Sequence, residues 1–358
     1  MRAIFILVTI LIVTPSIMDA QVIFGRLRDA VTKEPIEGVH VFISGTETGV
    51  ISDENGFYRF YTNGRKYFRL VFSHVSYEIE AYDFENLSEN IKLDKQLLGK
   101  MNMLEAVEVT ATRNRRRERR LKEFKDFFFG DYHDEDKIKI ENEYVIDFKR
   151  TSGGGFEVEG NPVLKVLNNH LNYEIYFHLL DYNDRNRYFF GYSDFTDLNS
   201  LNDIDNTEFE ENRKKAYWGS LRHFFYALIH DKLGEEGFST TLLESVKIAG
   251  NSTLLKQNSF NPTPLRVKDM HGFSSNIQLK KLESGLYELY IEHMVKITYL
   301  DELDAEGLPQ VSTLTLKKPI LINSNGVVAN PDGMGVEGYL INEGVYHFLP
   351  FEFSHVSR

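Results

Sequence analysis

Residues 24–60 read FGRLRDAVTKEPIEGVHVFISGTETGVISDENGFYRF and combine short β-type runs with strong turn signals. The runs GVHVFISG and GFYRF are rich in β-branched and aromatic residues, which are typical of half-buried strands. Pro35 precedes the first run and Asp53-Glu54-Asn55-Gly56 leads into the second, and these residue types favour turns. The stretch therefore predicts strands at intervals of about ten residues, the spacing of a β-sandwich.

The same pattern continues on both sides of that stretch, over residues 22–112. Further strand candidates are VIFGRL, YFRLVFSHV, YEIEAYDF and MLEAVEVTA, and Asn63-Gly64 marks another turn. No helical period of useful length interrupts them. About ninety residues can bury one modest core between two sheets. We therefore expect a small β-sandwich at residues 21–112.

The turn residues of this region resemble the carboxypeptidase-like regulatory domain. That family has a Pro-Ile/Leu-x-Gly-Val/Ala turn, a Gly-Thr turn, and a Thr/Ser-Asp-x-x-Gly turn followed by an aromatic residue. The matching residues are Gly25, Pro35, Ile36, Gly38, Val39, Gly45, Thr46, Gly49, Ser52, Asp53, Gly56 and Phe57. The resemblance implies a transthyretin-like, seven-stranded sandwich of structural or interaction type, without an active site of its own.

Residues 104–111 (LEAVEVTA) are similar to the stretch that follows this domain in TonB-dependent outer-membrane transporters. A plug and 22 strands come next in those proteins. Strands of roughly ten residues would use about 220 residues before any plug or loop. The rest of the chain is too short for that, and the sequence argues against a transporter.

Residues 1–20 have the features of a cleavable secretory signal. Arg2 gives a positive start, residues 4–13 are almost entirely apolar, and Ala20 is a small residue before the expected cut. The apolar stretch is well short of the roughly twenty residues of a membrane span. The chain has no cysteine, which excludes disulfides, thiolate metal sites and a lipid-modified cysteine. We expect an exported protein, periplasmic or outer-membrane associated, with no transmembrane helix after signal cleavage.

The net charge of −12 is unevenly distributed along the chain. Residues 113–125 (RNRRRERRLKEFK) hold eight basic and two acidic residues. Such a block is either a solvated linker or helix, or a patch that meets anionic lipid headgroups, lipopolysaccharide phosphates or an acidic partner. Its candidate contact residues are Arg115, Arg116, Arg117, Arg119 and Arg120. Export argues against a nucleic-acid partner.

Residues 126–358 mix strand-like runs with one helical period, which predicts an α+β domain with a mainly antiparallel sheet. In NYEIYFHLL (172–180), Tyr173, Ile175, Phe177 and Leu179 alternate onto one face. Over residues 209–233 apolar side chains recur at three- and four-residue steps, which predicts one long amphipathic helix. The chain as a whole is expected to be mainly β.

Several motifs of this second part resemble a set of uncharacterised exported bacterial proteins that carry the same regulatory domain at their front. These motifs are FFFG (127–130), NPVLKVLN (161–168), RKKAYWGS (213–220), EGF (236–238) and LPFE (349–352). The resemblance implies an architecture and no established activity. The expected organisation is a signal at 1–20, the sandwich at 21–112, a basic linker or helix at 113–125, and an α+β domain at 126–358.

Candidate chemistry is sparse in this sequence. HExxH, GxSxG, P-loop and GxGxxG motifs are all absent, and we expect neither an enzyme nor a cofactor. Asp134 and Asp136 lie in an acidic loop whose oxygens would suit a hard cation, although a solvated turn explains the loop as well. Trp218, Arg222 and His223 could line a groove for a partner, although histidines are more often packed or on the surface.

Functions of different classes are compatible with these features. The favoured hypothesis is a non-catalytic interaction or scaffold protein of the bacterial cell envelope, whose sandwich presents loops or a sheet edge to an envelope protein partner. The alternative is a glycan-binding protein, suggested by the likeness of the fold to carbohydrate-binding sandwiches and by 27 Phe and 19 Tyr. A hydrolase and a small outer-membrane barrel are less favoured.

Overall fold

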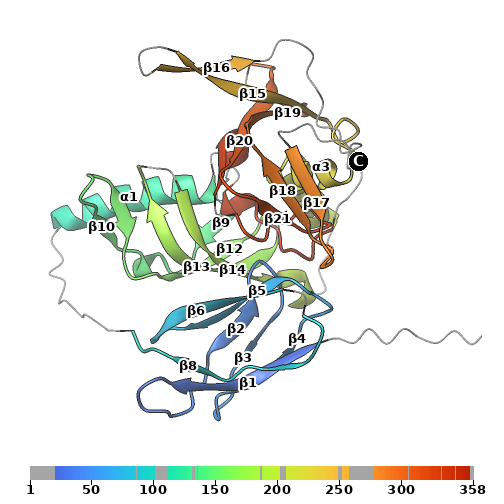
Figure 1. Cartoon of the computed structure of the whole chain (residues 1–358). Helices are drawn as coiled ribbons and strands as arrows, with labels where there is room; N and C mark the ends of the chain where they lie inside the picture. Colours follow the sequence, from blue (N-terminus) through green and yellow to red (C-terminus); the bar gives the residue numbers. More distant parts are fainter. Residues whose placement is uncertain are drawn as a thin grey trace, which may run out of the picture.

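A computed structural model describes residues 21–354, apart from residues 86, 101–110, 131–133, 135, 186–187, 202–206, 249–251, 258–276, 305, 332 and 343. The predicted signal, residues 1–20, lies outside the described residues, as does most of the transporter-like stretch at 104–111. The chain is mainly β, as the sequence predicts. In Figure 1 the sandwich lies below, α1 and its sheet lie above it to the left, and the C-terminal sheets lie above it to the right.

The N-terminal unit is a sandwich of two sheets, which confirms the prediction. One sheet has the order β4-β1-β7, with β8 also paired to β1, and the other has the order β3-β2-β5-β6. The strands are β1 (Val22–Asp29), β2 (His40–Ile43), β3 (Gly49–Ile51), β4 (Phe57–Tyr61), β5 (Phe68–His74), β6 (Tyr77–Phe84), β7 (Ile91–Lys92) and β8 (Lys95–Leu97). Ile23, Leu27, Leu70 and Phe72 are fully buried between the sheets. Within residues 21–100, Asn86 excepted, eight strands replace the expected seven, because the chain pairs twice with β1 through the short β7 and β8.

The middle unit packs a helix on an antiparallel sheet of order β14-β13-β12-β9. Its elements are α1 (Ala111–Phe129), β9 (Ile138–Ile140), β10 (Phe148–Arg150), β11 (Phe156–Val158), β12 (Val163–Asn168), β13 (Tyr173–Asn183) and β14 (Tyr188–Asp197). The basic block is helical because Leu121, Phe124 and Phe128 recur at three- and four-residue steps and bury one face of α1. The predicted apolar face of β13 is also buried.

The C-terminal unit holds two short helices and two sheets, of order β16-β15-β19-β20-β22 and β17-β18-β21. Its elements are α2 (Thr207–Tyr217), α3 (Leu221–Ile229), β15 (Phe238–Ile248), β16 (Ser252–Gln257), β17 (Ile277–Lys281), β18 (Tyr287–Ile291), β19 (Met294–Leu303), β20 (Pro309–Leu316), β21 (Ile320–Ile322) and β22 (Met334–Gly338). Short 3-10 helices occur in the middle unit at η1 (Glu143–Val145), directly after β14 at η2 (Leu198–Leu201), and near the C-terminus at η4 (Tyr339–Asn342) and η5 (Val345–His347). Each of the three units has its own cluster of buried apolar side chains.

The prediction of one long helix over residues 209–233 is wrong. Residues 218–220 break it into α2 and α3, because Gly219 adopts a left-handed φ of +80°. Ser220 then begins α3, since its Oγ accepts the backbone N–H of His223 at 3.1 Å. The apolar period continues across the break, and for this reason periodicity alone suggested a single helix. Within the part of the chain that the structure describes, no helix is both long and apolar enough to cross a membrane.

Candidate functional site

The three units meet where a turn of the sandwich, residues 44–48 (the docking turn), pairs with β14. The Gly45 N–H donates to the Ser193 carbonyl at 2.6 Å, and the Phe195 N–H donates to the Thr46 carbonyl at 3.0 Å. Thr46 and Asp194 thereby form a parallel bridge. The Gly-Thr turn of the sandwich thus extends the edge of the middle sheet.

The docking turn also holds residues 344–354, which we call the C-terminal segment. The Phe351 N–H donates to the Gly45 carbonyl at 2.8 Å. Gly45 has a φ of +79°, and a Cβ added there would lie 2.4 Å from the Phe351 ring. Glycine is therefore required at this position both by the backbone conformation and by the close approach of the ring.

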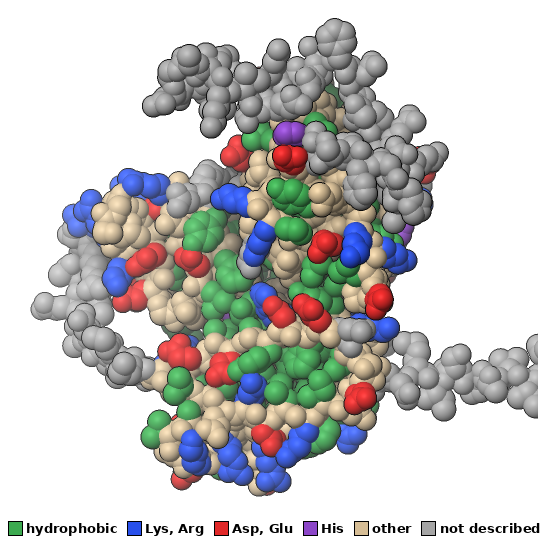
Figure 2. All heavy atoms as spheres, in the orientation of Figure 1, with side chains coloured by type: hydrophobic (Ala, Val, Ile, Leu, Met, Phe, Trp, Pro, Cys, Tyr) green, Lys and Arg blue, Asp and Glu red, His purple; other side chains and the backbone are tan. Residues whose placement is uncertain are grey.

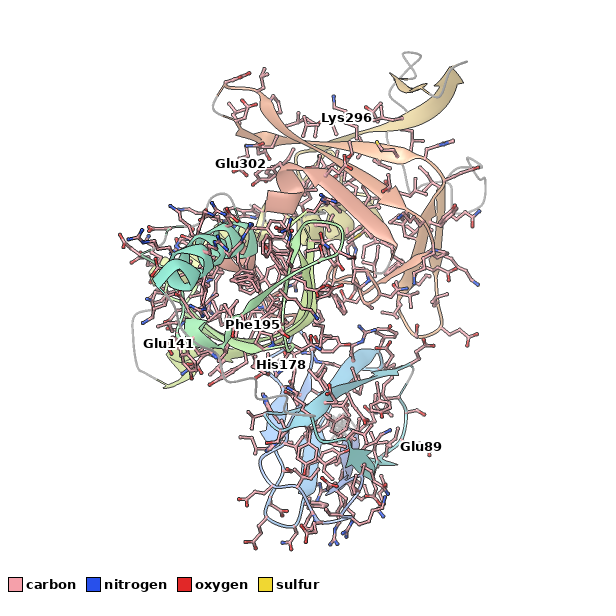
Figure 3. All side chains as sticks on the ribbon, turned by 90° about the vertical axis from the view of Figure 1, so that its left-hand side faces the viewer. Glu89, Glu141, His178, Phe195, Lys296 and Glu302 are labelled. Atoms are coloured by element: carbon pink, nitrogen blue, oxygen red, sulfur yellow. The ribbon has the colours of Figure 1, made fainter. Side chains whose placement is uncertain are left out.

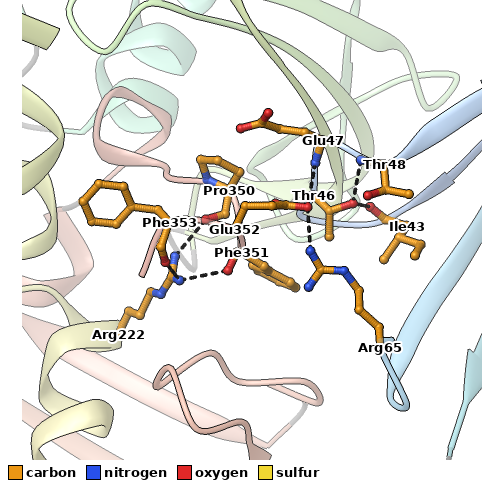
Figure 4. A network of polar contacts seen from close by, with 10 residues as sticks. All are labelled: Ile43, Thr46, Glu47, Thr48, Arg65, Arg222, Pro350, Phe351, Glu352 and Phe353. Atoms are coloured by element: carbon orange, nitrogen blue, oxygen red, sulfur yellow. Dashed lines mark hydrogen bonds and ion pairs between the residues drawn. The ribbon is translucent and has the colours of Figure 1, made fainter. Parts of the chain in front are cut away.

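Arg222 on α3 fixes the same C-terminal segment by donating to backbone carbonyls (Figure 4). Nη1 donates to the Pro350 carbonyl at 2.9 Å, and Nη2 donates to those of Phe351, at 3.1 Å, and Phe353. Nε donates to the Asn325 carbonyl at 3.3 Å. Burial lowers the pKa of the guanidinium to about 10, which leaves it charged at neutral pH.

An ion pair links the sandwich directly to the C-terminal segment. Arg65, between β4 and β5, donates from Nη2 to Oε1 of Glu352 at 2.6 Å. The same oxygen accepts the backbone N–H of Glu47 at 3.3 Å (Figure 4). Glu352 therefore joins the segment to the docking turn and to the loop before β5.

The sandwich also covers polar side chains on the middle sheet. His178 is 4% exposed, its Nδ1 lies 3.0 Å from the Ser73 hydroxyl, and its ring stacks on Phe42 with centroids 4.8 Å apart. Figure 3 shows His178 and Phe195 at the edge of the middle unit that faces the sandwich. Burial lowers the pKa of His178 to about 3, so its ring stays neutral at neutral and at mildly acidic pH. Its burial depends on the sandwich, which covers the face of β13 opposite the apolar one.

Asp194 is a buried carboxyl at the same junction. Its side chain is 6% exposed and its Oδ2 lies 3.5 Å from Nε2 of His40. Burial, together with the negative charges of Glu352 and Glu47, raises the pKa of Asp194 to about 7. Since burial lowers the pKa of His40, the two groups do not both carry charge readily.

Asp194→Asn is expected to stabilise the chain at pH 8 relative to the original protein, and to do so much less at pH 5. The pKa of Asp194 rises on folding from 3.8 to about 7, so the folded state binds the proton more tightly and stability falls as pH rises between about 4 and 7. Asparagine removes that loss, which amounts to roughly 2–3 kcal/mol between the two pH values. Urea unfolding of both proteins at pH 5 and pH 8 measures this difference in the free energy of unfolding. An equal effect of the substitution at the two pH values would show that the pKa of Asp194 does not rise on folding.

A cavity of about 360 Å³ lies between the three units, and we call it the junction cavity. Its walls come from the sandwich, β14, the α2–α3 corner, residues 286–331 and the C-terminal segment. Among the described residues that line it are three arginines, Arg65, Arg69 and Arg222, and no carboxylate. Apolar, basic and acidic side chains meet along the line where the sandwich joins the units above it (Figure 2).

The cationic side of the cavity is held in place by partners outside it. Arg69 on β5 donates from Nε and Nη2 to the carboxylate of Asp83 at 2.7 and 2.8 Å, and its guanidinium lies 5.6 Å from the centre of the Tyr192 ring. Tyr67 and Tyr192 also line the cavity. This wall can hold oxygen acceptors and flat rings together.

Two polar atoms of cavity-lining residues have no hydrogen-bond partner within the described part of the chain. They are Nε of Arg65 and Nδ1 of His347, and both are buried. Buried polar atoms are nearly always paired with protein, water or a ligand. The Arg65 N–H therefore needs an acceptor that the described part of the chain does not supply.

Of the three residues predicted to line a groove, Arg222 lines the junction cavity. His223 is 0% exposed, its Nδ1 accepts the Gly219 N–H at 3.0 Å and its Nε2 lies 3.0 Å from Glu236 Oε2. It therefore holds the α2–α3 corner and presents neither nitrogen to a partner. Trp218 is half-buried at the end of α2, where its backbone N–H donates to the Lys214 carbonyl.

The arginines of α1 whose side chains the structure describes, at positions 115–120, divide into two groups. Arg117 donates to the carbonyls of Glu143 and Ile146 at 2.8 and 3.0 Å, and Arg120 lies over the Phe156 ring at 3.5 Å. These two hold α1 against its own unit. Arg115, Arg116 and Arg119 are exposed, and Nε of Arg119 lies 3.7 Å from Oε1 of Glu123.

The acidic loop forms a turn through its own side chain. Asp134 Oδ1 accepts the backbone N–H of Asp136 at 3.0 Å. Among the described residues, which omit positions 131–133 and 135, no group of three or more potential metal ligands comes together. The hydrogen bond explains why aspartate occurs at position 134.

Sequence reasoning missed the junction cavity. Arg65, Tyr67 and Arg69 belong to the sandwich, whereas Tyr192 and His347 come from segments distant in the sequence. The Gly45-Thr46 motif predicts a turn of the sandwich, but it does not indicate that β14 and the C-terminal segment contact this turn.

Comparisons with known proteins agree with the N-terminal fold. Residues 23–109 match the model of the CarboxypepD_reg-like domain family. No curated protein is significantly similar to the chain.

Solved structures show weak likeness. A type II cohesin–X-dockerin complex from Acetivibrio cellulolyticus matches at 17% identity over 22% of this chain and 56% of that chain, less than two thirds of its length, with a TM-score of 0.20. A candidate carbohydrate-binding protein from Bacteroides uniformis ATCC 8492 matches at 10% identity over 52% of this chain and 82% of that chain, with a TM-score of 0.19. A candidate membrane-associated protein of unknown function from Bacteroides fragilis NCTC 9343 matches at 9% identity over 89% of this chain and 94% of that chain, with a TM-score of 0.18. Scores this low carry no argument about function. The family match, together with the two-sheet sandwich and its turn motifs, shows that residues 23–109 are a CarboxypepD_reg-like domain.

Proposed function

We propose that this protein is a non-catalytic binding protein of the bacterial cell envelope, and that it holds a small ligand in the junction cavity. The observation that carries the proposal is that all three units contribute walls to one cavity of about 360 Å³. Pockets for small ligands usually measure roughly 300–1,000 Å³ and lie where domains meet. A ligand there would contact the sandwich, the middle unit and the C-terminal unit at once.

The polar groups of the wall favour binding over catalysis. The charged groups that line the cavity in the described residues are arginines, whose hydrogen-bond role is donation alone. Arg222 is engaged with carbonyls of its own chain. Guanidinium donors and aromatic rings orient a ligand, whereas acid–base chemistry needs a proton acceptor that reaches the ligand, and Nδ1 of the lining residue His347 is buried.

The envelope location rests on the predicted signal at residues 1–20 and on the absence of cysteine. We propose that Arg115, Arg116 and Arg119, exposed on α1, contact an acidic envelope partner while the cavity holds its ligand. In that arrangement the protein is a scaffold that joins a small molecule to a larger assembly.

Glycan binding is the second candidate. Tyr67 and Tyr192 line the cavity, and aromatic rings with a polar hydroxyl suit the faces of sugars. Binding of neutral oligosaccharides at the cavity would favour this candidate.

A ligand screen on residues 21–358 tests the proposed function. A ligand is expected to raise the melting temperature of the chain saturably, because it binds the folded state alone. Ala329→Trp, which places an indole in the cavity wall, should abolish that rise, whereas Ala30→Trp, in a loop of the sandwich outside the cavity, should retain it. Mass spectrometry should recover the ligand unchanged. Ligands that bind Ala329→Trp equally well, or that are turned over, would overturn the proposal.

A further inference from the structure

We infer that the junction cavity takes a small organic anion, in which one acidic oxygen group is attached to an aromatic or apolar body. This inference rests on the proposed function and names the class of ligand. It follows from three properties of the wall: its charge, its unsatisfied donor and its apolar share.

The charge of the wall is one-sided. Arg65, Arg69 and Arg222 line the cavity and no described carboxylate does. The carboxylates that pair with two of them, Glu352 and Asp83, lie outside the lining. Within the described lining, an anion entering the cavity therefore meets guanidinium groups and no carboxylate.

Arg65 has capacity left for a second acceptor. Glu352 occupies its Nη2 at 2.6 Å, while the Nε–H is buried and has no partner within the described residues. A guanidinium presents its donors as a planar fork that matches the oxygens of a carboxylate, sulfonate or phosphate. His347 also lines the cavity, and its buried Nδ1 has no partner in the described chain.

Most of the remaining wall is apolar. Phe190, Phe348, Leu286 and Val328 line it, and they come from β14, the C-terminal segment and the C-terminal unit. An inorganic anion would leave these side chains uncovered, whereas an aromatic or branched body would cover them. The cavity volume of about 360 Å³ suits a molecule of one or two rings.

Two fluorescent probes of the same shape separate charge from apolarity. Anilinonaphthalene sulfonate carries an anionic group on an aromatic body, and N-phenylnaphthylamine has the same rings without the sulfonate. Titration of residues 21–358 should give one saturable site for the sulfonate and binding at least tenfold weaker for the neutral probe, since a hydrogen bond to a charged group contributes about 1.5–3 kcal/mol.

Matched variants locate the site. Arg65→Gln should weaken binding of the sulfonate about tenfold and leave the neutral probe unaffected. Glu352→Gln breaks the same Arg65–Glu352 ion pair without removing the cation, and should bind the sulfonate equally well or more tightly. Melting curves of both variants show whether they are folded. Parallel losses in the two variants would mean that the ion pair merely shapes the junction, and would overturn the assignment of Arg65.

The outcomes also distinguish this inference from the proposed function. Equal binding of both probes, abolished by Ala329→Trp, would retain the cavity as a binding site and overturn its preference for anions. If neither probe binds, but another ligand of the screen binds the original protein and not Ala329→Trp, the cavity is again retained as a binding site and its preference for anions is overturned. Sulfonate binding that survives Ala329→Trp would place the probe elsewhere and overturn the inference.

Discussion

Replacing Gly45 with alanine is expected to lower the free energy of unfolding by about 3 kcal/mol. Two costs combine there. A non-glycine residue at a φ of +79° is strained by about 1–3 kcal/mol, and a Cβ placed 2.4 Å from the Phe351 ring must displace it, at about 1–3 kcal/mol. Displacing Phe351 also weakens its hydrogen bond to the Gly45 carbonyl.

Gly307→Ala is the matched control for this prediction. Gly307 has a φ of +77°, but nothing lies within 4 Å of the position of an added Cβ. It should therefore lose about 1 kcal/mol from backbone strain alone. Urea unfolding of both variants measures the difference, which reports the contact between the docking turn and Phe351. Similar losses in the two variants would show that this contact contributes nothing.

The second large effect is expected for Arg222→Met, which should lower the free energy of unfolding by about 3 kcal/mol. Methionine keeps much of the apolar stem but leaves the carbonyls of Pro350, Phe351 and Asn325 without their donor. Each buried carbonyl that loses its partner costs about 1–3 kcal/mol, and part of this is recovered where the segment can reach water.

Arg222→Lys should lie between the original protein and Arg222→Met. Lysine keeps the charge but lacks the planar fork that reaches several carbonyls at once. Arg119→Met, on the exposed side of α1, is the control and should change the free energy of unfolding by less than about 0.5 kcal/mol. Urea unfolding measures all three, and an Arg222→Met variant as stable as the control would show that Arg222 does not anchor the segment.

The sandwich could be predicted from the sequence because its evidence is local. Turn residues such as Pro35 and Gly56 and the alternation of each strand are properties of adjacent positions. The same holds for the apolar face of β13. His178 lies on the other face of β13, and it is buried because the sandwich docks there.

Features that depend on contacts between distant segments could not be predicted. The break between α2 and α3 depends on Gly219, whose Cβ would lie 2.7 Å from the Tyr299 ring. The junction cavity depends on how three units are placed, which no local pattern encodes. The sequence indicated Arg222 because Trp218 and His223 lie near it. Its hydrogen bonds to the backbone carbonyls of the C-terminal segment could not be predicted, because no local pattern links residues so far apart.

The contact between Glu47 and Glu352 has a consequence for the order of folding. It joins residues 305 positions apart, so it closes nearly the whole chain into a loop. Contacts of such long separation form after local strands and helices, because the entropy of closing the loop must be overcome first. We therefore expect the docking turn to pair with β14 before it meets the C-terminal segment, and the junction cavity to be complete only once that segment is in place.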